Sequence, residues 1–284
     1  MTKTRRRTKQ EKAVIFVHIP KAAGTTLRKI IERQYKPTAI FTVQESIEEF
    51  KKLPEAQRTA IRCLMGHMRF GAHELLPRVS IYITVLRDPL DRVISHYYYV
   101  LRSPDNVLHN DVVSKSMSLK DFVCSGMTPE LDNGQTRRLS GVGHSIGFGQ
   151  CSTELLVSAK RNLRERFAVV GLAERFDETL ILLKRALGWR VPLYVKENVT
   201  RNRPPREEIS DDILDVMEKY NKLDIELYRY AQNIFEEQIG EKKPSFEREL
   251  KGFRLLNTLY SAIYLSSRPV IGNIKALARS YVCR

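Results

Sequence analysis

Long apolar runs are missing from this sequence: no window offers the roughly 18 uncharged residues that a membrane-spanning helix needs. Cysteine is scarce, and the four cysteines lie far apart, without the paired spacing of a metal site. Reduced thiols in a cytoplasm are the simplest explanation. The basic N-terminus precedes a predicted core strand and has no small-residue cleavage site, so we expect no secretory signal and a cytoplasmic location.

Repeats and low-complexity tracts are also missing, and the composition is that of a packed globular protein, with 42% hydrophobic and 29% charged residues. The net charge of +15 is uneven: residues 1–12 carry +5, residues 241–284 carry +6, and the 228 residues between them carry +4. Basic ends are usually solvated, so nucleic-acid binding is not indicated. We therefore divide the chain into a basic N-terminal tail (1–12), one main domain (13–240) and a basic, partly apolar, helical C-terminal extension (241–284).

Predicted strands alternate with predicted helices through the main domain. The strands are residues 13–19, 61–67, 79–89 and 167–172, and the helices after the first one are residues 46–53, 90–103, 119–125, 132–139, 152–164, 175–188 and 211–235. Such alternation indicates an α/β fold with a mostly parallel sheet that helices cover on both faces. Because ligands bind beyond the C-terminal ends of such strands, the strand ends before Pro20 and Arg87 are the places to look for a site.

The segment PKAAGTT joins the first strand to a helix. A turn of this kind exposes backbone N–H groups at the positive end of the helix dipole, and small residues let a ligand approach closely. Lys21 adds a point charge, while Thr25 and Thr26 add hydroxyl donors and can cap the helix. The segment therefore predicts an anion cradle, made by Lys21, Ala22, Ala23, Gly24, Thr25 and Thr26. The alternative is a tight turn with a solvent-facing lysine.

The familiar Gly-x4-Gly-Lys-Ser/Thr phosphate loop is absent, because here the lysine precedes the glycine. A kinase or another nucleotide triphosphatase is therefore disfavoured.

The second strand end, in TVLRDPLDRVISHYYY, carries Arg87, and Ser95 lies two turns into the following helix. These two side chains could grip a second phosphate. Alternatively, Arg87 could form an ion pair with Asp91, or Asp88 with Arg92, on an exposed helix start. Two phosphate sites on one sheet edge indicate a bis-phosphorylated nucleotide.

FVHIPKAAGTTL resembles the 5′-phosphosulfate-binding motif of the carbohydrate sulfotransferases, in the branch with heparan sulfate 2-O-sulfotransferase, and VLRDPLDRVISHYYY resembles the 3′-phosphate-binding motif of that branch. GHMRFG, DNGQTRRLSG, VVGLAERFDETLILLKRALGW and NVTRNR resemble its later landmarks, in the same order. The resemblance implies a P-loop NTPase-like three-layer sandwich in a bacterial, cytoplasmic member. It also implies transfer of a sulfuryl group from 3′-phosphoadenylyl sulfate (PAPS) to a carbohydrate or glycolipid hydroxyl, without a metal.

The same resemblance implies two catalytic roles. Lys21 takes up the charge of the leaving phosphate, and His67, which follows Gly66 at a predicted strand end, is the base. Histidine is the commonest proton-transfer residue; the alternative is a turn histidine bonded to backbone. His18 is the rival base, and we expect it to be structural, orienting the loop through a ring N–H.

The remaining predicted contacts belong to the donor or to the acceptor. The cradle residues bind the 5′ side of the donor, and Arg87 and Ser95 bind its 3′-phosphate. NVTRNR forms a lid with contacts from Thr200, Arg201 and Arg203, unless it is a solvated basic loop. The acceptor contacts are Asn133, Gln135, Arg137 and Arg138. An anionic acceptor would pair with Arg137 or Arg138, whereas the alternative is a charged outer helix face.

Several alternatives stay open. The acceptor is a carbohydrate, a glycolipid or a small hydroxylated molecule, and the oligomeric state is not predicted. The extension 241–284 packs against the main domain or lies on a membrane surface, and we expect packing. Two other functions compete with sulfuryl transfer: a kinase-like, nucleotide-dependent phosphotransferase that needs Mg²⁺, and a non-catalytic basic protein that binds membrane or nucleic acid.

Overall fold

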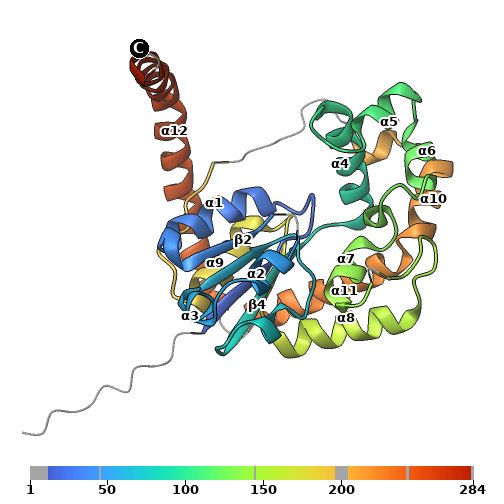
Figure 1. Cartoon of the computed structure of the whole chain (residues 1–284), viewed down its shortest axis with the longest axis horizontal. Helices are drawn as coiled ribbons and strands as arrows, with labels where there is room; N and C mark the ends of the chain where they lie inside the picture. The colour runs from blue at the N-terminus through green and yellow to red at the C-terminus, as the bar shows by residue number, and fades with distance from the viewer. Residues whose placement is uncertain (1–11, 45, 144, 196–203, 241–242, 283–284) are drawn as a thin grey trace, which may run out of the picture.

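The computed structural model describes residues 12–44, 46–143, 145–195, 204–240 and 243–282 (Figure 1). Its centre is one five-stranded sheet in the order β2-β3-β1-β4-β5, and every neighbouring pair is parallel. The strands are β1 Ala13–Val17, β2 Ile40–Val43, β3 Cys63–Gly66, β4 Ser80–Leu86 and β5 Phe167–Leu172. Val17 pairs with Gly66 on one side and with Thr84 on the other, so β1, β3 and β4 end close to the same sheet edge.

Helices cover both faces of the sheet (Figure 1). The α-helices are α1 Gly24–Gln34, α2 Glu48–Lys51, α3 Glu55–Ala60, α4 Pro89–Arg102, α5 His109–Ser114, α6 Leu119–Cys124, α7 Gly134–Ser140, α8 Thr153–Arg166, α9 Phe176–Leu187, α10 Asp211–Tyr220, α11 Lys222–Gly240 and α12 Lys243–Val282. Short 3₁₀ turns are η1 Pro37–Ala39, η2 Ala72–Leu75, η3 Pro129–Leu131 and η4 Arg206–Glu208. The predicted α/β fold with a parallel sheet between helical layers is confirmed.

Burial explains why these segments fold as they do. All five residues of β1 are buried, as a central strand of a doubly covered sheet requires. On α1, Leu27, Ile30 and Ile31 form the face that packs on this core. A second, smaller apolar cluster lies under α4, α5, α6 and α10, and it fixes α4 at the end of β4.

Three expectations about the elements were wrong. Strand β2 was missed, because its short, half-buried sequence gives little apolar signal. The single helix expected at residues 211–235 is two helices, which are separated at Asn221. The side-chain N–H groups of this buried residue donate to the carbonyls of Leu131 and Met217, both at 3.0 Å, and this interrupts the helix. Neither threonine caps α1, whose N-cap is Ala23.

Helix α12 packs on the main domain with one face. Phe246, Leu250 and Phe253 are buried in the main core, as expected for a packed extension. The opposite face leaves apolar side chains exposed, among them Leu255, Leu256, Leu259 and Ile263. Of the helices in the described ranges, none is both long enough and apolar enough to cross a membrane.

Candidate active site

The loop after β1 turns back on itself before α1 begins. Lys21 and Ala23 both adopt left-handed backbone conformations, with φ of 65° and 60°. The helical hydrogen bonds of α1 start where the N–H of Leu27 donates to the carbonyl of Ala23, at 3.2 Å. The N–H groups of Gly24, Thr25 and Thr26 therefore belong to the first turn, where no intrahelical acceptor exists. Together with the positive end of the helix dipole they can hold an anion, as the sequence predicts.

Gly24 is required by a close contact with His18. A Cβ atom on Gly24 would lie 1.9 Å from the His18 ring, a distance that no side chain can tolerate. The His18 ring in turn stacks on the ring of His67, with 4.2 Å between the ring centroids. The anion cradle and His67 are thus joined through one imidazole.

His67 is held so that one ring nitrogen stays available. Its Nδ1 lies 3.0 Å from the carbonyl oxygen of His18. Because a carbonyl only accepts, Nδ1 carries the proton and Nε2 carries the lone pair in the neutral ring. Burial and the nearby Arg138 guanidinium lower the pKa of His67, so the ring is neutral at pH 7. His18 therefore orients the base through its carbonyl and ring face, and its predicted role in orienting the loop through a ring N–H stays a prediction.

Lys21 projects over an aromatic ring of α4. Its Nζ lies 3.8 Å from the centroid of the Tyr99 ring. Burial, Arg102 and Arg87 lower the pKa of Lys21 to about 8. The ammonium is therefore still mostly charged at pH 7 and is surrounded by positive charge that an anion would neutralise.

Arg87 braces the cradle from the end of β4. Its guanidinium donates to the carbonyl of Lys21 at 3.0 Å, and it approaches the carboxylates of Asp91 and Glu174 at 3.9 and 4.0 Å. The predicted alternative, an Arg87–Asp91 pair, is thus present only as a loose contact. Ser95 is buried in α4. Arg87 directly follows β4 and Ser95 lies within α4, as predicted, and their roles toward a 3′-phosphate stay predictions.

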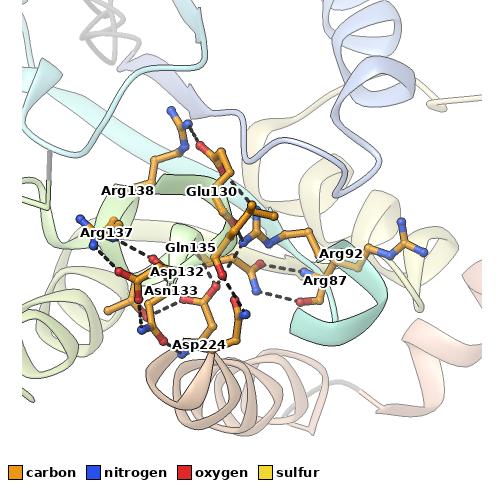
Figure 2. A network of polar contacts seen from close by, with 12 residues as sticks. Arg87, Arg92, Glu130, Asp132, Asn133, Gln135, Arg137, Arg138 and Asp224 are labelled. Atoms are coloured by element: carbon orange, nitrogen blue, oxygen red, sulfur yellow. Dashed lines mark hydrogen bonds and ion pairs between the residues drawn. The ribbon is translucent and has the colours of Figure 1, made fainter. Parts of the chain in front are cut away.

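Three of the predicted acceptor residues, Asn133, Gln135 and Arg137, belong to a buried polar network (Figure 2). The side-chain amide of Gln135 pairs with the backbone N–H and carbonyl of Arg87 at 3.0 and 2.9 Å. Asn133 accepts from the backbone N–H groups of Leu223 and Asp224 at the start of α11.

The guanidinium of Arg137 donates its hydrogen bonds to groups inside the protein (Figure 2). Arg137 is 4% exposed, and its guanidinium bonds to Asp132 and to the carbonyls of Gly143, Ile146 and Gly147. Asn133, Gln135 and Arg137 are buried, so the outer-face alternative is wrong for them. Arg137 also lines the cavity beside His67, and the acceptor roles of all three stay predictions. The hydrogen bonds of these three side chains fix the end of β4, the start of α11 and the loop after α7.

Arg138 contacts the candidate base directly. It donates to the backbone carbonyl of His67 and pairs with Glu130, which also bonds to the fully buried Arg92 (Figure 2). Burial opposes ionisation of Glu130, but Arg138 and Arg92 outweigh it and lower the pKa of Glu130 to about 2. A charged network therefore supports the backbone of the candidate base.

A cavity of about 470 Å³ opens beside His67. The segment from the end of β2 through α2, the segment after β3, the η3 turn and α7 form its walls. Positive charge comes from Lys51, Arg69, Arg137 and Arg138, and negative charge from Glu74 and Glu130. Polar walls next to an available imidazole nitrogen suit a hydroxylated acceptor.

A second cavity, of about 510 Å³, lies beyond the ends of β4 and β5. Asp88, Asp91 and Glu174 line it, together with Arg175 and Arg206. With Glu207 the lining holds four carboxylates, which make the cavity a poor place for a phosphate group.

Two further predictions concern the lid and a metal. Thr200, Arg201 and Arg203 lie outside the described residues. In the described ranges, no group of three or more His, Cys, Asp or Glu side chains is arranged to hold a metal ion.

Sequence reasoning missed two side chains that shape the site. Tyr99 stands in the quoted SHYYY run, and its spacing from Arg92 and His96 on α4 could have flagged it. Glu130 precedes α7 in a short turn, and nothing in the sequence around it marks a carboxylate that two arginines share.

Comparisons with known proteins identify the family of this chain. A family model described as galactose-3-O-sulfotransferase matches residues 2–278. The chain is 25% identical over 300 residues to human heparan-sulfate 6-O-sulfotransferase 1, covering 85% of this chain and 70% of the relative. It is 28% identical over 258 residues to human galactosylceramide sulfotransferase, covering 83% and 59%.

One solved structure is similar over most of its length. The crystal structure of mouse sulfotransferase SULT7A1 complexed with PAP aligns with a TM-score of 0.39 and 16% identity, over 85% of this chain and 89% of that one. The family match spans nearly all of this sequence, including both predicted phosphate motifs. The chain belongs to the galactose-3-O-sulfotransferase family.

Proposed function

We propose that this chain transfers the sulfuryl group of PAPS to a hydroxyl of a carbohydrate or glycolipid acceptor. Family membership confirms the prediction of a sulfotransferase. The observation that carries the proposal is the linked geometry of the site. The anion cradle holds Lys21, whose carbonyl accepts from Arg87. Gly24 of the cradle packs on His18, and His18 stacks on His67. His67 has an available nitrogen and lies at the mouth of a polar cavity.

The donor side of the reaction uses the cradle. PAPS supplies an activated sulfuryl group whose departure leaves negative charge on a phosphate. The N–H groups of Gly24, Thr25 and Thr26 and the ammonium of Lys21 are fixed in place before that charge develops, so they need little reorganisation to stabilise it. Arg87 keeps the loop in this shape by bonding to the Lys21 carbonyl.

The acceptor side uses His67. With its proton on Nδ1 held by the His18 carbonyl, the ring takes the acceptor proton at Nε2. Its lowered pKa keeps the ring unprotonated and ready at neutral pH. Arg138 and Arg69 line the cavity where the acceptor would lie, so Arg138 keeps its predicted acceptor role.

The finer predictions belong to the same proposal. They are membership of the branch with heparan sulfate 2-O-sulfotransferase, a bacterial origin, a cytoplasmic location, independence from metals, and donor contacts from Thr200, Arg201 and Arg203. The relatives named above act, by their names, on heparan sulfate and galactosylceramide, and this supports a glycan or glycolipid acceptor. No observation favours the kinase-like or the non-catalytic alternative.

Peripheral membrane contact through α12 is part of the proposal. The face of α12 that points away from the core exposes Leu255, Leu256, Leu259 and Ile263. Residues 250–284 contain six Lys/Arg and no Asp or Glu. Two copies packed through this segment would bring like charges together, whereas an anionic lipid surface would attract it. Co-sedimentation with phosphatidylglycerol vesicles, but not phosphatidylcholine vesicles, is expected, and Leu256→Glu/Leu259→Glu should abolish it.

A thermal-shift titration tests the donor site. Adenosine 3′,5′-bisphosphate at 100 times its Kd should stabilise the protein by about 2.7 kcal/mol, and ATP with Mg²⁺ should not match this. Arg87→Ala should weaken the shift, because the cradle loses its brace, and Arg161→Ala, on the exposed surface of α8, should leave it unchanged. An equal or larger shift with ATP and Mg²⁺ would point to the kinase-like function instead.

A labelled-sulfate transfer assay over glycolipid, oligosaccharide and small-molecule extracts then identifies the acceptor. Incorporation into a glycan or glycolipid fraction supports the proposal. Incorporation only into non-sugar molecules would show that the acceptor class is wrong.

A further inference from the structure

Lys21 has an unusual partner for a cation in an anion site. Its Nζ sits 3.8 Å from the ring centroid of Tyr99, well within the range of a cation–π contact. The guanidinium of Arg102 approaches the same ring at 5.9 Å. Among the residues that the structure describes, no carboxylate forms an ion pair with Lys21. The ring is therefore what stabilises the ammonium against its partial burial and the neighbouring cations.

The choice of an aromatic ring has a consequence for binding. A carboxylate beside Lys21 would cancel its charge and compete with an anionic ligand. A π face stabilises the cation and leaves its full charge available. An aromatic contact is thus suited to a lysine that must remain charged and unpaired until an anion arrives.

Tyr99 lies on helix α4, whose position is fixed by a cap and by buried contacts. Asp88 caps α4 by accepting from the N–H of Asp91, and Val93, Ile94 and Val100 bury the inner face of the helix. Tyr99 itself is 37% exposed, and its hydroxyl has no hydrogen-bond partner in the described part of the chain. The phenol oxygen is therefore dispensable for this contact, and the ring is what matters.

We propose that Tyr99 is a positioning residue for sulfuryl transfer, whose ring holds the ammonium of Lys21 charged and in place over the anion cradle. This inference rests on the proposed function. The charged and titratable groups that face Lys21 are Arg87 at the end of β4, and His96 and Arg102 on α4, so Tyr99 is the stabilising member of its surroundings.

Two substitutions separate the ring from the rest of the side chain. Tyr99→Phe keeps the π face, and Tyr99→Leu keeps apolar bulk without it. We expect kcat/KM for the donor to fall about three- to thirtyfold in Tyr99→Leu, the range that a lost cation–π contact allows, and to stay within about twofold in Tyr99→Phe. Tyr98→Leu is the matched control, because Tyr98 packs on Tyr97 and not on Lys21.

The pH profile supplies a readout that general damage to the fold would not produce. Lys21 must be charged, so activity should fall as pH rises through its pKa of about 8. Without the ring the charged form is less stable, so the alkaline limb should move to lower pH in Tyr99→Leu and stay in place in Tyr99→Phe. Equal profiles in all three proteins, or equal losses in both variants, would overturn the proposal.

Titration of Lys21 by NMR in lysine-labelled protein tests the contact without catalysis. The pKa of Lys21 should be lower in Tyr99→Leu than in the unmodified protein or Tyr99→Phe. If the unmodified protein transfers no sulfuryl group, the proposed function is wrong, while this titration still decides whether the ring holds the charge. A Lys21 pKa that is unchanged in Tyr99→Leu would refute the inference even in an active enzyme.

Discussion

Polar residues of similar type play different parts in this site. Arg137 and Arg138 are neighbours and both line the cavity, yet the guanidinium of Arg137 bonds to backbone carbonyls and Asp132, whereas that of Arg138 supports the backbone of His67 and pairs with Glu130. Asn133 and Gln135 likewise bond only to protein groups around the site. A guanidinium or an amide acts on whatever partner the fold brings within reach. At the residue scale, therefore, the orientation of a side chain decides between structure and chemistry.

His67→Ala tests the base. Removing the imidazole should lower kcat by about two to four orders of magnitude, the usual contribution of a positioned acid or base. Binding of adenosine 3′,5′-bisphosphate should change little, because His67 contacts the cradle only through His18. Steady-state kinetics and calorimetric titration measure the two effects. Near-normal turnover in the variant would remove His67 from the mechanism.

The strand-to-helix loop is the element on which both halves of the site depend. It places two residues at positive φ, brings Gly24 against His18, and starts α1 with free N–H groups. Small residues in PKAAGTT serve two purposes here: ligand access to the backbone, and room for the His18 ring. Because the His18 ring also stacks on His67, the contact between Gly24 and His18 couples the position of the loop to that of His67.

Gly24→Ala tests this element. The added methyl group would overlap the His18 ring, so we expect a loss of about 1–3 kcal/mol in unfolding free energy and much weaker bisphosphate binding. Gly240→Ala is the control, since a Cβ there meets nothing within 4 Å and alanine favours the helix. Urea unfolding and calorimetry provide the measurements. If Gly24→Ala bound the bisphosphate as tightly as Gly240→Ala does, the close contact would not be needed.

At the scale of the whole molecule, one sheet edge gathers the chemistry. The ends of β1, β3 and β4 carry the cradle, His67 and Arg87, and α4 and α7 close the site from the side. Because histidines are buried in this arrangement, the unfolding free energy decreases at acid pH. Burial and the charge of His67 lower the pKa of His18 to about 3, and burial, with Arg92 and Lys21, lowers the pKa of His96 to about 4.

Stability should therefore fall as pH drops below about 6.5. Between that value and the lowered pKa values the unfolded chain binds more protons than the folded one, so each of the two histidines removes about 2 kcal/mol between pH 7 and pH 5. Glu130, with its pKa of about 2, acts in the same direction at lower pH: its contribution to stability is present above about pH 4.5 and is lost as pH falls toward 2. Urea unfolding at pH 7 and pH 5 measures the difference.

His96→Leu provides the matched comparison. The buried Nδ1 of His96 has no hydrogen-bond partner in the described part of the chain, so an apolar side chain can replace it. The variant should lose the His96 contribution to the pH dependence, about 2 kcal/mol between pH 7 and pH 5. The same unfolding free energy at both pH values in the unmodified protein would show that these histidines are not buried as neutral groups.

The sequence by itself determined the α/β alternation, the parallel sheet, the two strand ends that matter, and the sulfotransferase family. Apolar runs and small-residue turns are local signals, readable without the fold. Only the tertiary structure decided that Asn133, Gln135 and Arg137 are buried and bonded to protein groups, that Asn221 interrupts a helix, and that Tyr99 and Glu130 lie at the site. Those roles depend on contacts between residues distant in sequence, such as Lys21 with Tyr99 and Gln135 with Arg87, and such contacts exist only once the chain is packed.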